Sequence, residues 1–253
     1  MLQKLLNLAR SRTDGREGLL YVAPDDPQVS AGEVLAVEGR GPPWLVVNKE
    51  PTAAIITSWP GRLWRVKICE AADDQPYSYA NYIRAISVRI LKEEDASVLF
   101  GPNGESVIPV LNAAATLTKS QAEKLADRRH AEASEAYNRI FHHWAKSVGE
   151  GRDSQDNLDG VIRLGGQAGG SPAYNAPSLI HNLVWKRAKS IDGDAATIVD
   201  EDGENVYMSA PWDGAETILR DAALALGTVD VGDENDREIL LSGWRQVAIL
   251  TPP

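Results

Sequence analysis

The sequence predicts an α+β fold, in which a mixed β-sheet with one small helix precedes a helix-rich part with one β-hairpin. Short apolar runs with alternating polarity occupy the chain up to about residue 117, a pattern typical of strands. From Thr118 to Val148, apolar residues recur mostly at spacings of three and four, as on one face of a helix. We therefore predict a mixed α+β sheet domain (1–117), a long core helix (118–148), a mobile Gly-rich loop (149–171) and a helix-rich domain (172–253).

The first segments of the sheet domain predict two short helices and several strands. The opening stretch "MLQKLLNLARSR" places leucines at helical spacing, which predicts a short amphipathic helix docked on the body. In "NKEPTAAIITSW", Asn48 suits a helix N-cap and Pro51 suits the first turn, so a second helix is expected there and is ended by Pro60-Gly61. Strands are expected at residues 19–23, 33–37 and 42–47.

The stretch "TSWPGRLWRVKI" predicts a half-buried strand. Trp64, Val66 and Ile68 alternate with Arg65 and Lys67, so one face is apolar and the other carries solvated cations. Two more strands are predicted over residues 83–91 and 106–110. Between them lies "FGPNGES", whose Asn-Gly pair is typical of a hairpin turn.

The long helix is expected to begin at a capping box and to form the centre of the fold. Thr118 is followed three residues later by Gln121, the spacing that a capping box requires. The apolar stripe then ends in the large side chains of Phe141 and Trp144, and Gly149 ends the helix. Beyond the Gly-rich loop, helices are predicted over residues 176–191, 210–227 and 233–249, with a hairpin about an Asp-Gly turn over residues 196–209.

The charge balance limits the classes of partner. The formal net charge is −10, so most of the surface repels nucleic-acid phosphates and anionic lipids. A nucleic-acid partner is therefore disfavoured, and a basic protein is the natural partner. No apolar stretch reaches the length that a membrane span needs, and a cytoplasmic protein is expected.

The titratable residues predict neither a metal site nor a cofactor. Cys69 is the only cysteine, which excludes an intrachain disulfide and a thiolate zinc cluster, and it closes an apolar run as a small buried side chain. His130, His142 and His143 would point in directions about 100–120° apart around the predicted helix, so they do not converge on one metal ion. The sequence contains no nucleophile elbow, P-loop or dinucleotide-binding motif, and no catalytic residue is assigned.

The best candidate site lies in the sheet domain. Tyr77, Tyr79 and Tyr82 occupy a polar loop that leads into a strand, where aromatic side chains serve either as a lid over the sheet or as a contact surface. Both interpretations remain open. Together with three cations, these tyrosines form the predicted partner-binding site: Tyr77, Tyr79, Tyr82, Arg62, Arg65 and Lys67.

Two functional hypotheses follow from these observations. The first is stoichiometric protein–protein binding of the immunity, inhibitor or regulatory-accessory type, supported by the acidic charge and by abundant Trp and Tyr, which are favoured at interfaces. The alternative is an enzyme in the sheet domain whose site no motif encodes, with a nucleotide such as NAD as substrate. The strand–helix–strand layout predicted over residues 44–68 is similar to that of small sheet modules of ADP-ribosyltransferases, but none of that family's catalytic residues can be placed on this chain, and no family is assigned.

Overall fold

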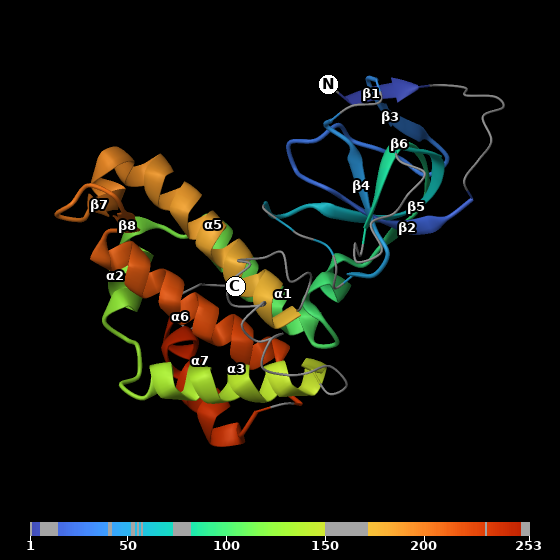
Figure 1. Cartoon of the computed structure of the whole chain (residues 1–253). Coiled ribbons are helices and arrows are strands. Elements are labelled where there is room, and N and C mark those ends of the chain that lie inside the picture. Colours follow the sequence, from blue (N-terminus) through green and yellow to red (C-terminus); the bar gives the residue numbers. More distant parts are fainter. Residues whose placement is uncertain are drawn as a thin grey trace. The chain divides into compact units, whose positions relative to one another are not determined.

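A computed structural model of the chain confirms the α+β class and divides it into two compact units. It describes residues 2–5, 15–39, 42–51, 54, 56, 58–72, 82–149, 172–230 and 232–248. Residues 1–99 form the sheet unit and residues 100–253 form the helical unit, drawn from blue to green and from green to red in Figure 1. None of the described helices is long and apolar enough to cross a membrane.

The sheet unit is a small antiparallel barrel. Its strands are β1 (Leu2–Leu5), β2 (Glu17–Val22), β3 (Val34–Val37), β4 (Leu45–Asn48), β5 (Arg62–Ala71) and β6 (Tyr82–Glu94). The long strand β6 pairs with β3, β4 and β5, and β2 pairs with both β5 and β4. The path β2–β5–β6–β4 thus returns to β2. At this closure a Cβ on Gly18 would lie 2.6 Å from the carbonyl oxygen of Asn48, so the close approach requires glycine.

The predicted alternation along β5 is confirmed. Trp64, Val66 and Ile68 are buried in the barrel core, whereas Arg65 and Lys67 are partly exposed. Cys69 is also buried, as expected of a small apolar side chain.

Both helices predicted in the sheet unit are wrong where the structure describes them. Residues 2–5 form a strand paired with β3 rather than a helix. In residues 48–59, Asn48 is the last residue of β4, and no α-helix occurs among the described residues of this segment. Ala54 and Ile56 are both buried, and the Ala54 amide donates to the carbonyl of Pro51 at 3.1 Å, a bond to the third preceding residue, as in a 3-10 turn, and not to the fourth, as in an α-helix.

The boundary between the units lies near residue 99 instead of residue 117, because the predicted strand over residues 106–110 is part of a helix. A 3-10 turn, η2 (Ala96–Phe100), is followed by α1 (Gly104–Thr116). The buried positions Val107, Val110, Leu111 and Ala114 follow the helical period. The predicted hairpin turn is therefore absent at this point, and the residue with positive φ is Gly101.

The predicted long helix is two helices, α2 (Lys119–Ala126) and α3 (Ala133–Gly149). The capping box of Thr118 and Gln121 is confirmed. The helix breaks at residues 127–132, the segment "DRRHAE". This segment contains no large apolar side chain that would continue the apolar face of the predicted helix. Phe141 is only half-buried. The predicted mobile loop lies outside the described residues from residue 150 on.

The centre of the helical unit is α6 (Ala210–Gly227), not the segment 118–148. This helix contacts α1, α2, α3, α5 (Pro172–Asp192) and α7 (Glu234–Ala248), as Figure 1 shows. A Cβ on Gly214 would lie 2.8 Å from the Cα of Ala126, so glycine lets α2 lie directly against α6. The three helices predicted after residue 171 are confirmed.

The predicted hairpin is also confirmed. A 3-10 turn, η3 (Gly193–Ala196), leads into β7 (Thr197–Val199), which pairs with β8 (Val206–Met208). Gly203 in the Asp-Gly turn has a positive φ of 73°, a conformation that glycine adopts without strain.

Candidate functional site

The structure separates the predicted site residues that it describes. Tyr77 and Tyr79 lie outside the described residues. Tyr82 is the first residue of β6 and pairs with Asn48 of β4. Arg62 lies on β5 near the opposite end of β6, because Leu63 pairs with Glu94. Arg65 and Lys67 follow on β5.

Two of the three predicted cations already bind carboxylates of the same chain. Arg62 donates from Nε to Oε1 of Glu93 at 2.8 Å and its guanidinium lies 4.5 Å from the centre of the Trp64 ring. Arg65 donates from Nε to Oε1 of Glu94 at 2.5 Å. These arginines hold the pKa of each glutamate below its ordinary value. A phosphate or a partner carboxylate would therefore have to displace an existing ion pair.

The β7–β8 hairpin has a fixed base in the helical unit. Ala196 and Met208 are buried at the start and the end of the hairpin. The Ser209 amide donates to the carbonyl of Ala196 at 2.8 Å, and Nζ of Lys189 donates to Oγ1 of Thr197 at 3.0 Å. These contacts attach the ribbon to the end of α5 and the start of α6.

A buried tryptophan strengthens this attachment. Trp212 on α6 is fully buried, and its Nε1 donates to Oδ2 of Asp192, the last residue of α5, at 2.9 Å. Lys119 donates to the other oxygen of Asp192 at 3.0 Å. The two hydrogen bonds lower the pKa of Asp192, with the Trp212 bond as the larger cause. The two helices that carry the hairpin are therefore joined just behind it.

Beyond its base, the hairpin exposes apolar side chains. The exposed fractions are 54% for Ile198, 54% for Val199, 52% for Val206 and 56% for Tyr207. These four side chains and the turn between them, residues 200–205, form what we call the β7–β8 tip. In Figure 1 the tip projects past the ends of α5 and α6. Large apolar groups clustered on a projecting ribbon are typical of a contact surface.

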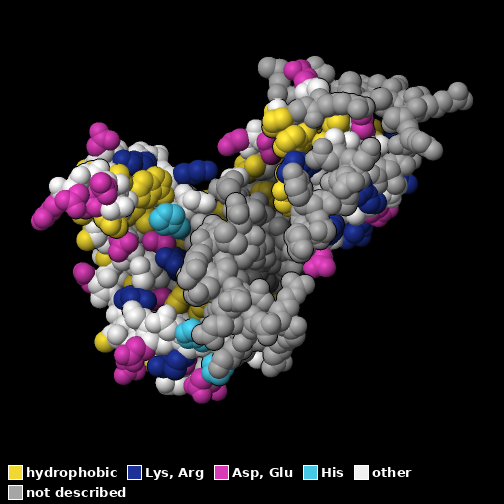
Figure 2. Space-filling view, viewed as in Figure 1, with side chains coloured by type: hydrophobic (Ala, Val, Ile, Leu, Met, Phe, Trp, Pro, Cys, Tyr) yellow, Lys and Arg dark blue, Asp and Glu magenta, His cyan; other side chains and the backbone are white. Residues whose placement is uncertain are grey.

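The turn of the β7–β8 tip is acidic and ordered. It contains four carboxylates, those of Asp200, Glu201, Asp202 and Glu204. Asp200 accepts hydrogen bonds from the side chain and the backbone amide of Asn205 and from the amide of Glu204, and these bonds lower its pKa. Figure 2 shows acidic and hydrophobic side chains side by side at this end of the helical unit. The tip thus combines apolar area with negative charge.

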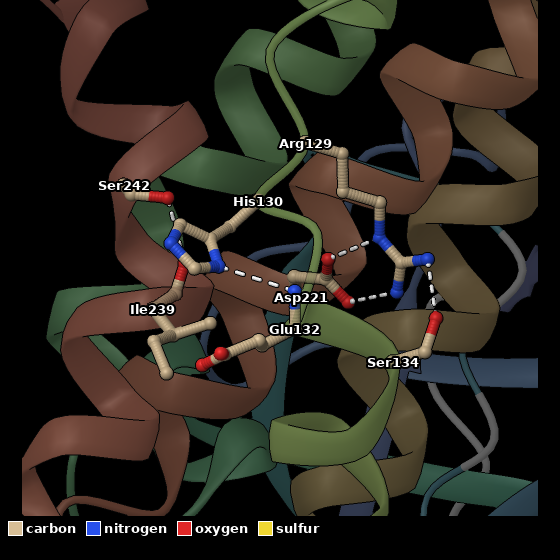
Figure 3. Close-up of polar contacts among 7 residues, drawn as sticks. All are labelled: Arg129, His130, Glu132, Ser134, Asp221, Ile239 and Ser242. Carbon is tan, nitrogen blue, oxygen red and sulfur yellow. Dashed lines mark hydrogen bonds and ion pairs between the residues drawn. The ribbon is translucent and has the colours of Figure 1, made fainter.

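A second polar arrangement lies on α6 and is drawn in Figure 3. Asp221 is buried and binds Arg129 of the 127–132 break: Nε donates to Oδ2 at 2.8 Å and Nη2 donates to Oδ1 at 3.3 Å. Nη1 of Arg129 donates to Oγ of Ser134 at 2.8 Å. Burial raises the pKa of Asp221, although Arg129 opposes this effect. In the same view the Glu132 amide donates to Nδ1 of His130.

One turn earlier on α6, the buried Glu216 contacts an arginine and a histidine side chain. Nη1 of Arg220 donates to Oε1 of Glu216 at 3.2 Å, and Nδ1 of His181 lies 3.4 Å from the same oxygen. The bond with Glu216 raises the pKa of His181. His181 comes from α5 and Arg129 from the α2–α3 break, so these ion pairs join the surrounding elements to α6. The described residues contain no group of His, Cys, Asp and Glu that would hold a metal ion.

The sequence contained a signal for the β7–β8 tip. The strands "TIV" and "VYM" are apolar at adjacent positions, whereas a half-buried ribbon alternates apolar and polar residues. Comparisons of the chain with protein-family models, with curated proteins and with solved structures give no match.

Proposed function

We propose that the protein acts by stoichiometric binding to another protein with a basic surface, and that the β7–β8 tip is its contact. The observation that carries this proposal is the exposure of four apolar side chains beside four carboxylates on a ribbon with a fixed base. An immunity, inhibitor or regulatory-accessory role belongs to this class of function.

The energetics support a binding role for the tip. Burying one large apolar side chain at an interface contributes about 1.5–3 kcal/mol, so Ile198 and Tyr207 are suitable anchors. Because the base of the hairpin is held by α5 and α6, little order has to be gained on binding. The carboxylates of the turn would attract a basic partner and raise the association rate.

We prefer this function to an enzyme acting on a nucleotide such as NAD. In the sheet unit, Arg62 and Arg65 would be the natural ligands of a nucleotide phosphate, but Glu93 and Glu94 bind them. The predicted surface that includes Tyr77, Tyr79 and Tyr82 stays a second candidate contact for a protein partner.

The test begins with a photo-crosslinking amino acid in place of Tyr207 in the native cell. The crosslinked protein is then purified, and its affinity and association rate are measured with the unmodified chain. We expect the double variant Ile198→Ser/Tyr207→Ser to bind at least about tenfold more weakly, as expected when anchors of this size are lost. Val229→Ser, which alters a side chain 38% exposed elsewhere on the helical unit, is the matched control.

The charge contribution is tested separately. Replacing Glu201, Asp202 and Glu204 with their amides should slow association and reduce its salt dependence while leaving the dissociation rate almost unchanged. If both sets of variants bind the purified partner as the unmodified chain does, with circular dichroism showing intact folds, the β7–β8 tip is not the contact.

A further inference from the structure

We propose that the partner docks as an extended basic segment that adds a third strand to an edge of the β7–β8 ribbon. This inference rests on the proposed function and specifies the chemistry and the geometry of the partner.

The hydrogen-bond register of the hairpin determines which backbone groups face outward. Ser209 bonds to Ala196 and Asp200 bonds to Asn205 across the ribbon. In an antiparallel pair, hydrogen-bonded and non-hydrogen-bonded residue pairs alternate. Val199 and Val206, which face each other, are therefore a non-hydrogen-bonded pair, and their N–H and C=O groups point away from the ribbon.

These outward amides are available to a third strand. The Thr197 amide is already occupied by the carbonyl of Asp194. By contrast, the amides of Val199 and Val206 donate to no group in the described part of the chain. An apolar strand edge with open N–H and C=O groups is a template for pairing with another chain.

The side chains of the tip favour strand addition over docking on one flat face. Successive residues of a strand point to opposite faces, so the cross-strand pair Ile198–Tyr207 lies on one face and the pair Val199–Val206 lies on the other. All four side chains are more than half exposed. A flat partner surface would cover one pair, whereas an added strand places alternate side chains beside both pairs.

The charge of the turn selects the occupant. A second copy of this chain carries the same four carboxylates on its own tip, so it would bring no positive charge to complement them, and like charges oppose such pairing. A segment that alternates apolar residues with Lys or Arg would instead match both the apolar pairs and the carboxylates. The geometry therefore points to a basic extended segment of a different protein.

The test uses a synthetic eight-residue peptide of alternating Lys and Val, with a Glu–Val peptide as its control. Hydrogen exchange of the labelled protein is followed by NMR during titration. We expect the Lys–Val peptide, and not the Glu–Val peptide, to slow exchange of the Val199 or the Val206 amide. The unchanged protection of the Ser209 amide would show that the hairpin itself stays intact.

Proline variants separate strand addition from other modes of docking. Val199→Pro and Val206→Pro each remove an outward N–H that the hairpin does not use, a position where an edge strand tolerates proline. The matched controls, Val199→Thr and Val206→Thr, keep the N–H and the β propensity. We expect the proline variant at the occupied edge to weaken peptide binding at least about tenfold, and its threonine control to remain within about threefold.

The outcomes are distinguishable from those of the proposed function. Strand addition is overturned if the Lys–Val peptide protects neither amide, or if both proline variants bind it as well as their threonine controls. In that case, loss of partner binding in Ile198→Ser/Tyr207→Ser would still support docking at the tip by another geometry. Normal partner binding by that double variant would instead overturn the proposed function.

Discussion

Replacing Arg129 with methionine tests whether the ion pair on α6 is needed for the stability of the helical unit. The variant keeps an unbranched apolar stem but removes the guanidinium, so the carboxylate of Asp221 loses both of its charged hydrogen bonds. Asp221 has only 3% of its side chain exposed. A carboxylate that remains charged at this depth without a partner strongly destabilises the folded state.

The expected cost follows from the burial of the two partners. Breaking a buried pair from one side typically costs about 3–5 kcal/mol. Because 31% of the Arg129 side chain is exposed, water reaches the site, and we take the lower end of that range, about 3 kcal/mol. For a unit of this size, such a loss lowers the melting temperature by about 6–12 °C.

Thermal and denaturant unfolding at two pH values is the assay. The folded-state pKa of Asp221 is already raised by burial, and without Arg129 it rises further above the unfolded value of about 3.9. A group with a raised pKa destabilises the folded state as the pH rises through that pKa. The difference in the free energy of unfolding between the variant and the wild type should therefore be larger at about pH 7 than at about pH 5.

A second substitution supplies the control. Asp221→Asn keeps the shape of the side chain and removes the charge, so Arg129→Met/Asp221→Asn should be more stable at neutral pH than Arg129→Met alone. If Arg129→Met unfolds at the wild-type midpoint, or if Asp221→Asn recovers no stability, the buried carboxylate is not what this arginine stabilises.

Three further predictions concern the helical unit. Gly214→Ala should cost about 1–3 kcal/mol by overpacking against Ala126, measured by denaturant unfolding; a gain in stability would show that α2 can move away from α6. Thr118→Ala should cost about 1 kcal/mol through loss of the N-cap, whereas Thr118→Ser should not; equal midpoints for the two variants would contradict the capping box. The bond with Glu216 raises the pKa of His181 above its ordinary 6.5. The interaction of His181 with Glu216 therefore contributes fully to the free energy of unfolding below about pH 6.5, and this contribution is lost as the pH rises through the folded-state pKa. His181→Asn should therefore lower the unfolding midpoint more at about pH 6 than at about pH 8.5. An equal decrease at the two pH values would show that the protonated His181 does not stabilise the folded state through Glu216.

The sequence predicted the strand β5 and the carboxy-terminal helices well because each has a complete pattern of its own. Trp64, Val66 and Ile68 alternate cleanly with polar residues, and the hairpin around Gly203 has a defined turn residue. By contrast, Ala54 and Ile56 lie in a segment that follows a good N-cap residue, yet both are buried and neither is in a helix. Tertiary packing outweighed local propensity at that point.

The candidate site was harder to predict because exposure is a property of the whole unit. The apolar residues of "TIV" and "VYM" would be core residues if another element covered them, and only the structure shows that they project beyond α5 and α6. In the same way, Glu216 and Asp221 read as surface charges in a helical pattern. Their burial follows from the number of helices that surround α6.

The long strand β6 has a consequence for how the sheet unit is made in the cell. Three other strands, β3, β4 and β5, each pair along one edge with residues 82–94, whereas β2 and β4 meet at a single residue pair. During synthesis at about 5–20 residues per second, β5 is complete about one to five seconds before the last residue of β6 is added. During that interval, the edges of β3, β4 and β5 that later pair with β6 have no partner. This is therefore the stage at which a nascent chain would benefit most from a chaperone.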